Sequence, residues 1–115
     1  MANETIYILD QVTPKAGRAQ EFLKAYMDRY APGAAARGMK HEFTWIGPPM
    51  WLENQPNTLF FIWSVQGAPA WWAMEHQARR DPSVMDWWRE ADTMIETRRR
   101  SFLSNVSDVA SLTNV

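Results

Sequence analysis

One stretch decides the fold that this sequence predicts: Thr58-Leu59-Phe60-Phe61-Ile62-Trp63-Ser64-Val65. Its residues are mostly of the branched and aromatic kinds that favour strands, and Leu59 to Trp63 are all apolar. A strand with one face in water would alternate apolar and polar residues. We therefore expect this strand to be covered on both faces, on one by helices of its own chain and on the other by something else.

Other segments around this strand also have strand character. In one of them, simple alternation would place His41, Phe43 and Trp45 on the same face. The last segment, which holds Phe102 and Leu103, fits either a short strand or the continuation of a helix, and we favour the strand. The three segments are Thr5–Val12, Met39–Ile46 and Arg98–Val106.

Helical spacing appears twice between these strands. The segment Arg18–Tyr30 carries an apolar stripe of Phe22, Tyr26 and Tyr30, and Pro32-Gly33 is expected to end that helix. A second helix should start near Pro69, after the strand that holds Trp63. Asp81-Pro82 then has the form of a new helix start, with Asp as the N-cap and Pro in the first turn, and that helix should run to about residue 97.

The resulting order β-α-β-β-α-β is the ferredoxin-like pattern, an α+β fold with an antiparallel sheet and helices on one face. The other sheet face is bare in a single chain, yet the stretch around Trp63 is apolar on both faces. A bare apolar sheet face predicts self-association, so we expect a homodimer. Residues 1–106 would form the domain, and residues 107–115 a polar tail that frays or reaches a partner.

Composition sets further bounds. The chain has 115 residues, 46% of them apolar and 22% charged, which suits one globular domain. A net charge of −1 gives no electrostatic footprint for nucleic acid, and the absence of cysteine excludes thiol chemistry. Because no apolar run approaches a membrane span and no signal peptide is evident, we expect a cytoplasmic protein that does not enter the membrane. Seven Trp exceed what one small core needs, so the surplus should line a pocket or an interface.

Three motifs resemble the dimeric α+β barrel superfamily. They are Ile8-Leu9-Asp10-Gln11-Val12-Thr13-Pro14-Lys15-Ala16-Gly17, a strand entering a turn; Phe60-Phe61-Ile62-Trp63-Ser64; and Asp81-Pro82 followed by Trp87-Trp88. Over roughly residues 5–106 the chain is most similar to NIPSNAP-type domains, and more loosely to the antibiotic-biosynthesis monooxygenase branch. The resemblance implies a ligand pocket between sheet and helices and a dimer formed through the other sheet face. It also implies a small hydrophobic, often aromatic, ligand.

One branch of this superfamily, the haem-degrading enzymes, fits less well. Trp63 matches its strand tryptophan, but Asp10 stands where that branch has Asn, and no His lies near residues 88–90, where the haem ligand would be. We therefore expect no haem. We also expect no metal and no other cofactor, because the two His lack ligand spacing and no phosphate-binding loop is present, although a His together with Asp10 or Glu42 could still form a metal site in the folded chain.

Three polar residues are the catalytic candidates. His41, between bulky strand neighbours, is of the residue type that most often acts as a general base, or is simply a half-buried His bonded to the backbone. His76 shares a helix face with Trp72; it reaches the pocket if that face looks inward and is solvated otherwise. Asp10 would be partly desolvated if its face meets the helices, with a partner among Arg18, Tyr26 or a His, or would only bond its own turn.

Aromatic side chains supply the candidate walls of the pocket, with plain core packing as the alternative for each. The run Arg98-Arg99-Arg100 would either clamp a carboxylate or phosphate or form a solvated face. The candidate substrate-binding residues are Tyr26, Tyr30, Phe43, Trp45, Phe61, Trp63, Trp72 and Trp88.

Three hypotheses for function follow. The first is a small cofactor-independent enzyme of isomerase, cyclase, lyase or monooxygenase type, acting on an aromatic or polyketide-like substrate through an enolate- or phenolate-like intermediate held away from water. The second is a non-catalytic small-molecule binder or stress-type accessory protein of the same fold. The third is a structural oligomer, which predicts no ligand-sized pocket and a Trp63 buried entirely by protein.

Overall fold

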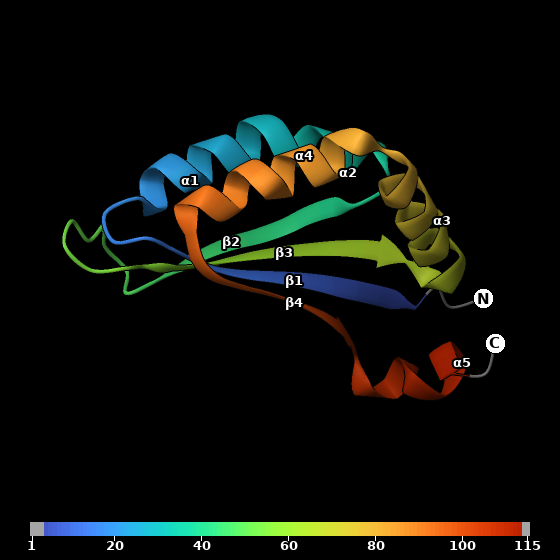
Figure 1. Ribbon diagram of the computed structural model, residues 1–115. Helices are drawn as coiled ribbons and strands as arrows, with labels where there is room; N and C mark the ends of the chain where they lie inside the picture. The colour runs from blue at the N-terminus through green and yellow to red at the C-terminus, as the bar shows by residue number, and fades with distance from the viewer. Residues whose placement is uncertain (1–3, 114–115) are drawn as a thin grey trace.

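The computed structural model describes residues 4–113 and has helices packed on one face of an antiparallel sheet (Figure 1). The sheet has the strand order β2-β3-β1-β4. This arrangement confirms the ferredoxin-like α+β class and the strand expected near Phe102, which begins earlier than predicted, at Ile95. The strands are β1 (Thr5–Pro14), β2 (Lys40–Gly47), β3 (Thr58–Gln66) and β4 (Ile95–Ser104).

Helices α1, α2 and α4 lie over one face of this sheet, α3 stands across one end of it, and α5 lies past the end of β4, apart from the helical layer (Figure 1). Asp81 caps α4 as predicted, since its carboxylate accepts a hydrogen bond from the Ser83 backbone N–H. Short 3₁₀ turns follow α4 and β4. The helices are α1 (Ala19–Ala25), α2 (Ala31–Ala36), α3 (Gly67–Arg80), α4 (Pro82–Ala91) and α5 (Val109–Thr113).

Pro32-Gly33 does not end the first helical segment, contrary to the expectation. The helix continues from α1 through a π-helical turn, Tyr26–Tyr30, into α2, where Pro32 occupies the first turn. In the π turn the Ala31 N–H bonds to the Tyr26 carbonyl five residues back, so the chain is already wound differently where proline enters. A proline at a helix start lacks only an N–H that would have no intrahelical partner there.

The predicted common face of His41, Phe43 and Trp45 is wrong, because β2 contains a bulge. The pairing of β2 with β3 shifts between His41 and Phe43. His41 therefore lies opposite Trp63 on the helix-covered face, whereas Phe43 and Trp45 lie opposite Ile62 and Phe60 on the other face. Simple alternation fails here because one extra residue reverses the direction of every side chain after it.

The core lies between the sheet and the helices. On β3, Leu59, Phe61, Trp63 and Val65 are all buried on this face. Rings from the first helical segment fill the space above them, and Tyr26 stacks on Phe61 with 3.7 Å between ring centroids. This aromatic layer explains why the third strand carries large side chains on its inner face.

The opposite sheet face has no helix over it (Figure 1). Phe43 is 52% exposed and Trp45 55% exposed, and the two rings stack on each other. Leu103, on the same face of β4, is also exposed. We call the sheet face that carries these three residues the open face. Separately, no helix among residues 4–113 is long and apolar enough to cross a membrane.

Candidate functional site

A buried charge pair between β1 and β4 forms the centre of the site. Asp10 is 2% exposed and lies directly opposite Arg100 in the sheet, on the helix-covered face. The Arg100 Nε donates to Asp10 Oδ1 at 2.6 Å, and Arg100 Nη2 donates to Asp10 Oδ2 at 2.9 Å. This two-pronged geometry is the strong form of an arginine–carboxylate bond.

Two core aromatic residues extend the pair into a network. The Tyr26 hydroxyl donates to Asp10 Oδ2 at 2.8 Å and accepts from the indole Nε1 of Trp63 at 2.8 Å. Burial, and then the negative charge of Asp10, raise the pKa of Tyr26 well above its ordinary value. The phenol therefore stays neutral and serves as a fixed donor to the carboxylate.

Arg100 also contacts a second tyrosine. Its Nη2 donates to the Tyr30 hydroxyl at 2.8 Å, and its guanidinium lies near the rings of Tyr30 and Trp88. Burial alone would lower the pKa of Arg100, but its hydrogen bonds to Asp10 and Tyr30 and the charge of Asp10 raise it above its ordinary value. Arg100 is thus a permanent cation, and within residues 4–113 its Nη1 has no hydrogen-bond partner.

The network limits what Asp10 can do. Both of its oxygens already accept hydrogen bonds, Oδ1 from Arg100 and Oδ2 from Arg100 and Tyr26. An acceptor occupied in this way is a poor general base, so the geometry makes Asp10 the group that fixes Arg100. The group available to a ligand is the guanidinium, whose side chain is 27% exposed.

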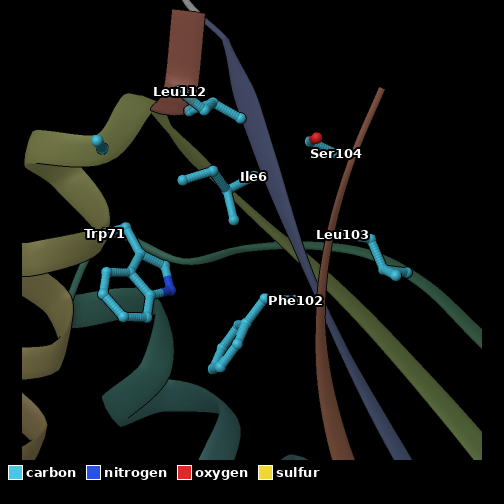
Figure 2. A pocket seen from close by; sticks show the side chains of 7 residues that line it. Ile6, Trp71, Phe102, Leu103, Ser104 and Leu112 are labelled. Carbon is cyan, nitrogen blue, oxygen red and sulfur yellow. The ribbon is translucent and has the colours of Figure 1, made fainter. Parts of the chain in front are cut away.

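An apolar cavity lies at one end of the sheet, between α3, β1 and β4. Its volume is about 240 Å³. Figure 2 shows Ile6, Trp71 and Phe102 facing one another across it, with Leu112 of α5 at its rim. Trp71 meets Phe102 edge to face, with 5.4 Å between ring centroids. We call this space the Trp71 cavity; Ala68, Leu103 and Ser104 complete its lining.

The cavity and the charge pair are neighbours along β4. Phe102 and Arg100 are two residues apart on one face of the strand, and both face the helices, opposite Ile8 and Asp10. Successive residues on one face of a strand lie roughly 7 Å apart. Arg100 itself does not line the cavity, so only a ligand that extends past Phe102 would reach its guanidinium.

The candidate histidines do not join Asp10. His41 stacks on Trp63, and its Nε2 lies 2.7 Å from the Thr44 hydroxyl. It stands on β2, three strand spacings, roughly 14 Å, from Arg100 on β4. His76 is exposed, and Trp72 on the same helix face is 54% exposed. That face of α3 looks outward, which corresponds to the solvated alternative for His76.

The candidate wall residues separate into three groups. Tyr26, Tyr30, Phe61 and Trp63 are buried in one aromatic core, and Trp63 is only 1% exposed. Trp88 is half-buried, beside Arg98 and Arg100. Phe43 and Trp45 lie on the open face, away from the helices. None of the eight lines the Trp71 cavity.

Two residues of the candidate site were not predicted individually from the sequence. Arg100 was singled out only as part of a three-arginine run, although strand alternation through Arg98 and Arg100 would have turned both toward one face, with Arg99 opposite. Trp72 was a candidate and its neighbour Trp71 was not, because packing decides which face of α3 points toward the sheet. The described residues, 4 to 113, contain no cluster of three His, Asp or Glu side chains that would suit a metal ion.

Comparison with known proteins identifies the fold. No protein-family model and no curated protein matches the sequence. A NIPSNAP domain protein from Burkholderia xenovorans has a similar structure, with a TM-score of 0.70 and 18% identity over 89% of this chain and 95% of that one. A NIPSNAP family protein of unknown function from Agrobacterium tumefaciens also has a TM-score of 0.70, with 11% identity over 91% of each chain.

A more distant match is a candidate antibiotic biosynthesis monooxygenase from Nitrosomonas europaea. Its TM-score is 0.57, with 8% identity over 92% of this chain and 94% of that one. The likeness to NIPSNAP domains that the sequence motifs indicated is thus confirmed for the fold, as is the looser likeness to the monooxygenase branch. Similarity at these identities establishes fold and leaves activity to the site.

Proposed function

We propose that this protein binds a small apolar or aromatic molecule in the Trp71 cavity and transforms it without a cofactor, as an isomerase, cyclase, lyase or monooxygenase. The observation that carries the proposal is an apolar cavity lined by Phe102, with a permanently charged, partly exposed guanidinium, that of Arg100, two residues away on the same face of β4. A volume of about 240 Å³ suits a molecule of one or two small rings. The distant likeness to a candidate monooxygenase supports the same direction.

The proposed chemistry centres on stabilising an anion. All four reaction types pass through an enolate- or phenolate-like intermediate, and a cation that is already in place favours that form of the substrate. Arg100 is held by Asp10, so it does not have to reorganise as charge develops. The Tyr30 hydroxyl accepts from Arg100 Nη2 and so helps to hold the guanidinium in place. The proton lost by the substrate passes to solvent at the exposed edge of β4.

A non-catalytic binder is the second candidate, and one observation favours it. Asp10 is fully hydrogen-bonded, and neither histidine is near it, so no free general base faces the cavity. The structural-oligomer hypothesis has mixed support. Trp63 is enclosed by protein, as that hypothesis expects, but a cavity of ligand size exists.

We also propose that the protein acts as a homodimer joined through the open face. Phe43, Trp45 and Leu103 together give this face an apolar surface that no element of the same chain covers. An isologous dimer would bring the same residues together from both copies.

The first experiment is native mass spectrometry of the purified protein, with bound molecules released and identified. We expect an aromatic or other apolar molecule in the wild type. Ala68→Leu should lose it, because the longer side chain fills the cavity from α3. Ala73→Leu, an exposed position on the same helix, is the matched control and should retain it. Equal retention by both variants would overturn the proposed location of the pocket.

A second experiment separates enzyme from binder. The released molecule is incubated with the protein in air and under nitrogen, and its conversion is followed. An enzyme should convert it, and Arg100→Gln should lower kcat about 100-fold while the apolar cavity still binds, because the cation that stabilises the anionic intermediate is lost. Binding without conversion under both conditions would leave the binder as the function.

A further inference from the structure

Arg37 is a buried cation without an ionic partner. It follows α2 directly, is only 8% exposed, and forms no ion pair within residues 4–113. Its Nε is enclosed and has no hydrogen-bond partner. The terminal nitrogens make no hydrogen bond to the described residues either, but they are not enclosed as Nε is. Arginine is rarely buried to this degree unless it is paired.

The surroundings compensate this charge only in part. The guanidinium lies over the Tyr30 ring, 5.6 Å from its centroid, and gains a cation–π contact there. Gly33 leaves room for it, because a side chain there would bring a Cβ within 3.2 Å of Arg37 Nη1. A buried charge whose hydrogen-bonding groups are unfilled costs stability that one ring face does not restore.

The nearby charged groups form no ion pair with Arg37 within the described residues. Arg100 lies near the same Tyr30 ring, with 5.8 Å between its guanidinium carbon and the ring centroid, and its charge is already paired with Asp10. Asp81 is an acidic group that interacts electrostatically with Arg37. Its pKa is lowered mainly by hydrogen bonds from Ser83, and less by the charge of Arg37. Asp81 Oδ1 accepts hydrogen bonds from Ser83, and Asp81 and Arg37 form no ion pair. Arg37 therefore keeps its donors free.

We infer that Arg37 anchors a binding site for the carboxylate of a small molecule. A planar carboxylate matches the fork of a guanidinium, and it would fill terminal nitrogens that no described residue fills. The site is distinct from the Trp71 cavity, whose lining does not include Arg37. The guanidinium lies over the Tyr30 ring, and this aromatic neighbour favours a carboxylate attached to a flat or apolar body.

The test measures the melting temperature and binding of the full-length protein with benzoate, benzamide and inorganic phosphate, at constant ionic strength. Benzoate should raise the wild-type Tm, and its neutral isostere benzamide should not. Arg37→Gln should weaken benzoate binding in calorimetry by about tenfold or more, since a charge-assisted bond is lost. Arg89→Gln, an exposed arginine on α4, makes the same change of charge and should leave binding unaltered.

A second variant distinguishes loss of the binding group from loss of the folded structure. Arg37→Met replaces an uncompensated buried charge by an apolar chain, so it should melt at or above the wild-type temperature without ligand and lose the benzoate-dependent rise. Three outcomes would overturn the inference. They are no rise with benzoate in the wild type, an equal rise in Arg37→Met, and a rise produced by phosphate alone, which would make the ligand an inorganic anion.

Discussion

At the scale of single residues, the Asp10–Arg100 pair is the strongest determinant of both stability and site geometry. Asp10→Asn removes the negative charge and leaves Arg100 partly buried and unpaired, so we expect a loss of about 3–5 kcal/mol in the free energy of unfolding. Urea denaturation measures it. The control is Asp92→Asn, which breaks the exposed Arg98–Asp92 pair and should cost less than about 1 kcal/mol. Equal losses would mean that burial does not distinguish the two pairs.

Tyr26 makes stability sensitive to alkaline pH. Its pKa is raised in the folded protein, so the unfolded chain releases this proton first as pH rises. Stability from this residue is therefore complete below the ordinary tyrosine pKa of about 10 and is lost as pH climbs from there toward the folded value.

Tyr26→Phe should be less stable than the wild type at neutral pH, but it should lose less stability as the pH rises. It should lose about 1–3 kcal/mol at neutral pH, because Trp63 Nε1 and Asp10 each lose a partner, yet its stability should fall less steeply above pH 10. Thermal melts from pH 8 to 11 measure both effects. The control Tyr7→Phe, on the opposite sheet face, should keep the wild-type alkaline slope; an unchanged slope in Tyr26→Phe would contradict the assignment.

At the scale of elements, the turn between β1 and α1 depends on a close approach of two backbones. Gly17 has φ of +77°, and a Cβ there would lie 2.5 Å from the Glu53 carbonyl oxygen. Gly17→Ala should therefore destabilise the fold by about 1–3 kcal/mol through strain and collision together. Gly38→Ala isolates the strain, since Gly38 has φ of +95° but no atom within 4 Å of its Cβ position, and it should cost less. Calorimetric melts compare the two.

Elements also show where sequence reasoning succeeds and where it stops. The start of α4 was predictable because Asp81 and Pro82 act locally, through a cap and a fixed φ. The bulge after His41 and the π turn at Tyr26 were not, because each depends on how the segment fits its neighbours. Since the bulge decides which face His41 and Trp45 occupy, an error in one residue's pairing moved two candidates to opposite sides of the sheet.

The same reasoning applies to the site. Tyr26 was one of three partners expected for Asp10 if its face met the helices, beside Arg18 and a His, and it is the one of these that bonds to Asp10. Arg100 is 90 residues from Asp10 in the chain, and only the antiparallel register of β1 and β4 makes them partners. The spacing of residues in the sequence does not predict that register.

At the scale of the whole molecule, the shape of the protein leaves the open face uncovered. The principal extents are 49 × 31 × 18 Å, the proportions of one helical layer on one sheet. Its radius of gyration, 15.2 Å, exceeds the roughly 13 Å expected for a compact chain of this length. Such a thin body cannot enclose both sheet faces, so the apolar open face is either exposed to water or covered by a second copy.

The proposed dimer therefore yields a sharp prediction. Trp45→Glu places a charge on the open face, on the edge strand β2, where burial against a partner would leave it without a counter-ion. We expect the wild type to sediment as a dimer at micromolar concentration and Trp45→Glu as a folded monomer with the same far-UV circular dichroism.

Trp51→Glu is the matched control for this experiment. Trp51 is 45% exposed on the loop between β2 and β3, outside the open face, so the same change there should leave the dimer intact. A monomeric wild type would refute the dimer directly. Dissociation by both variants alike would show that the loop, rather than the open face, holds the two copies together.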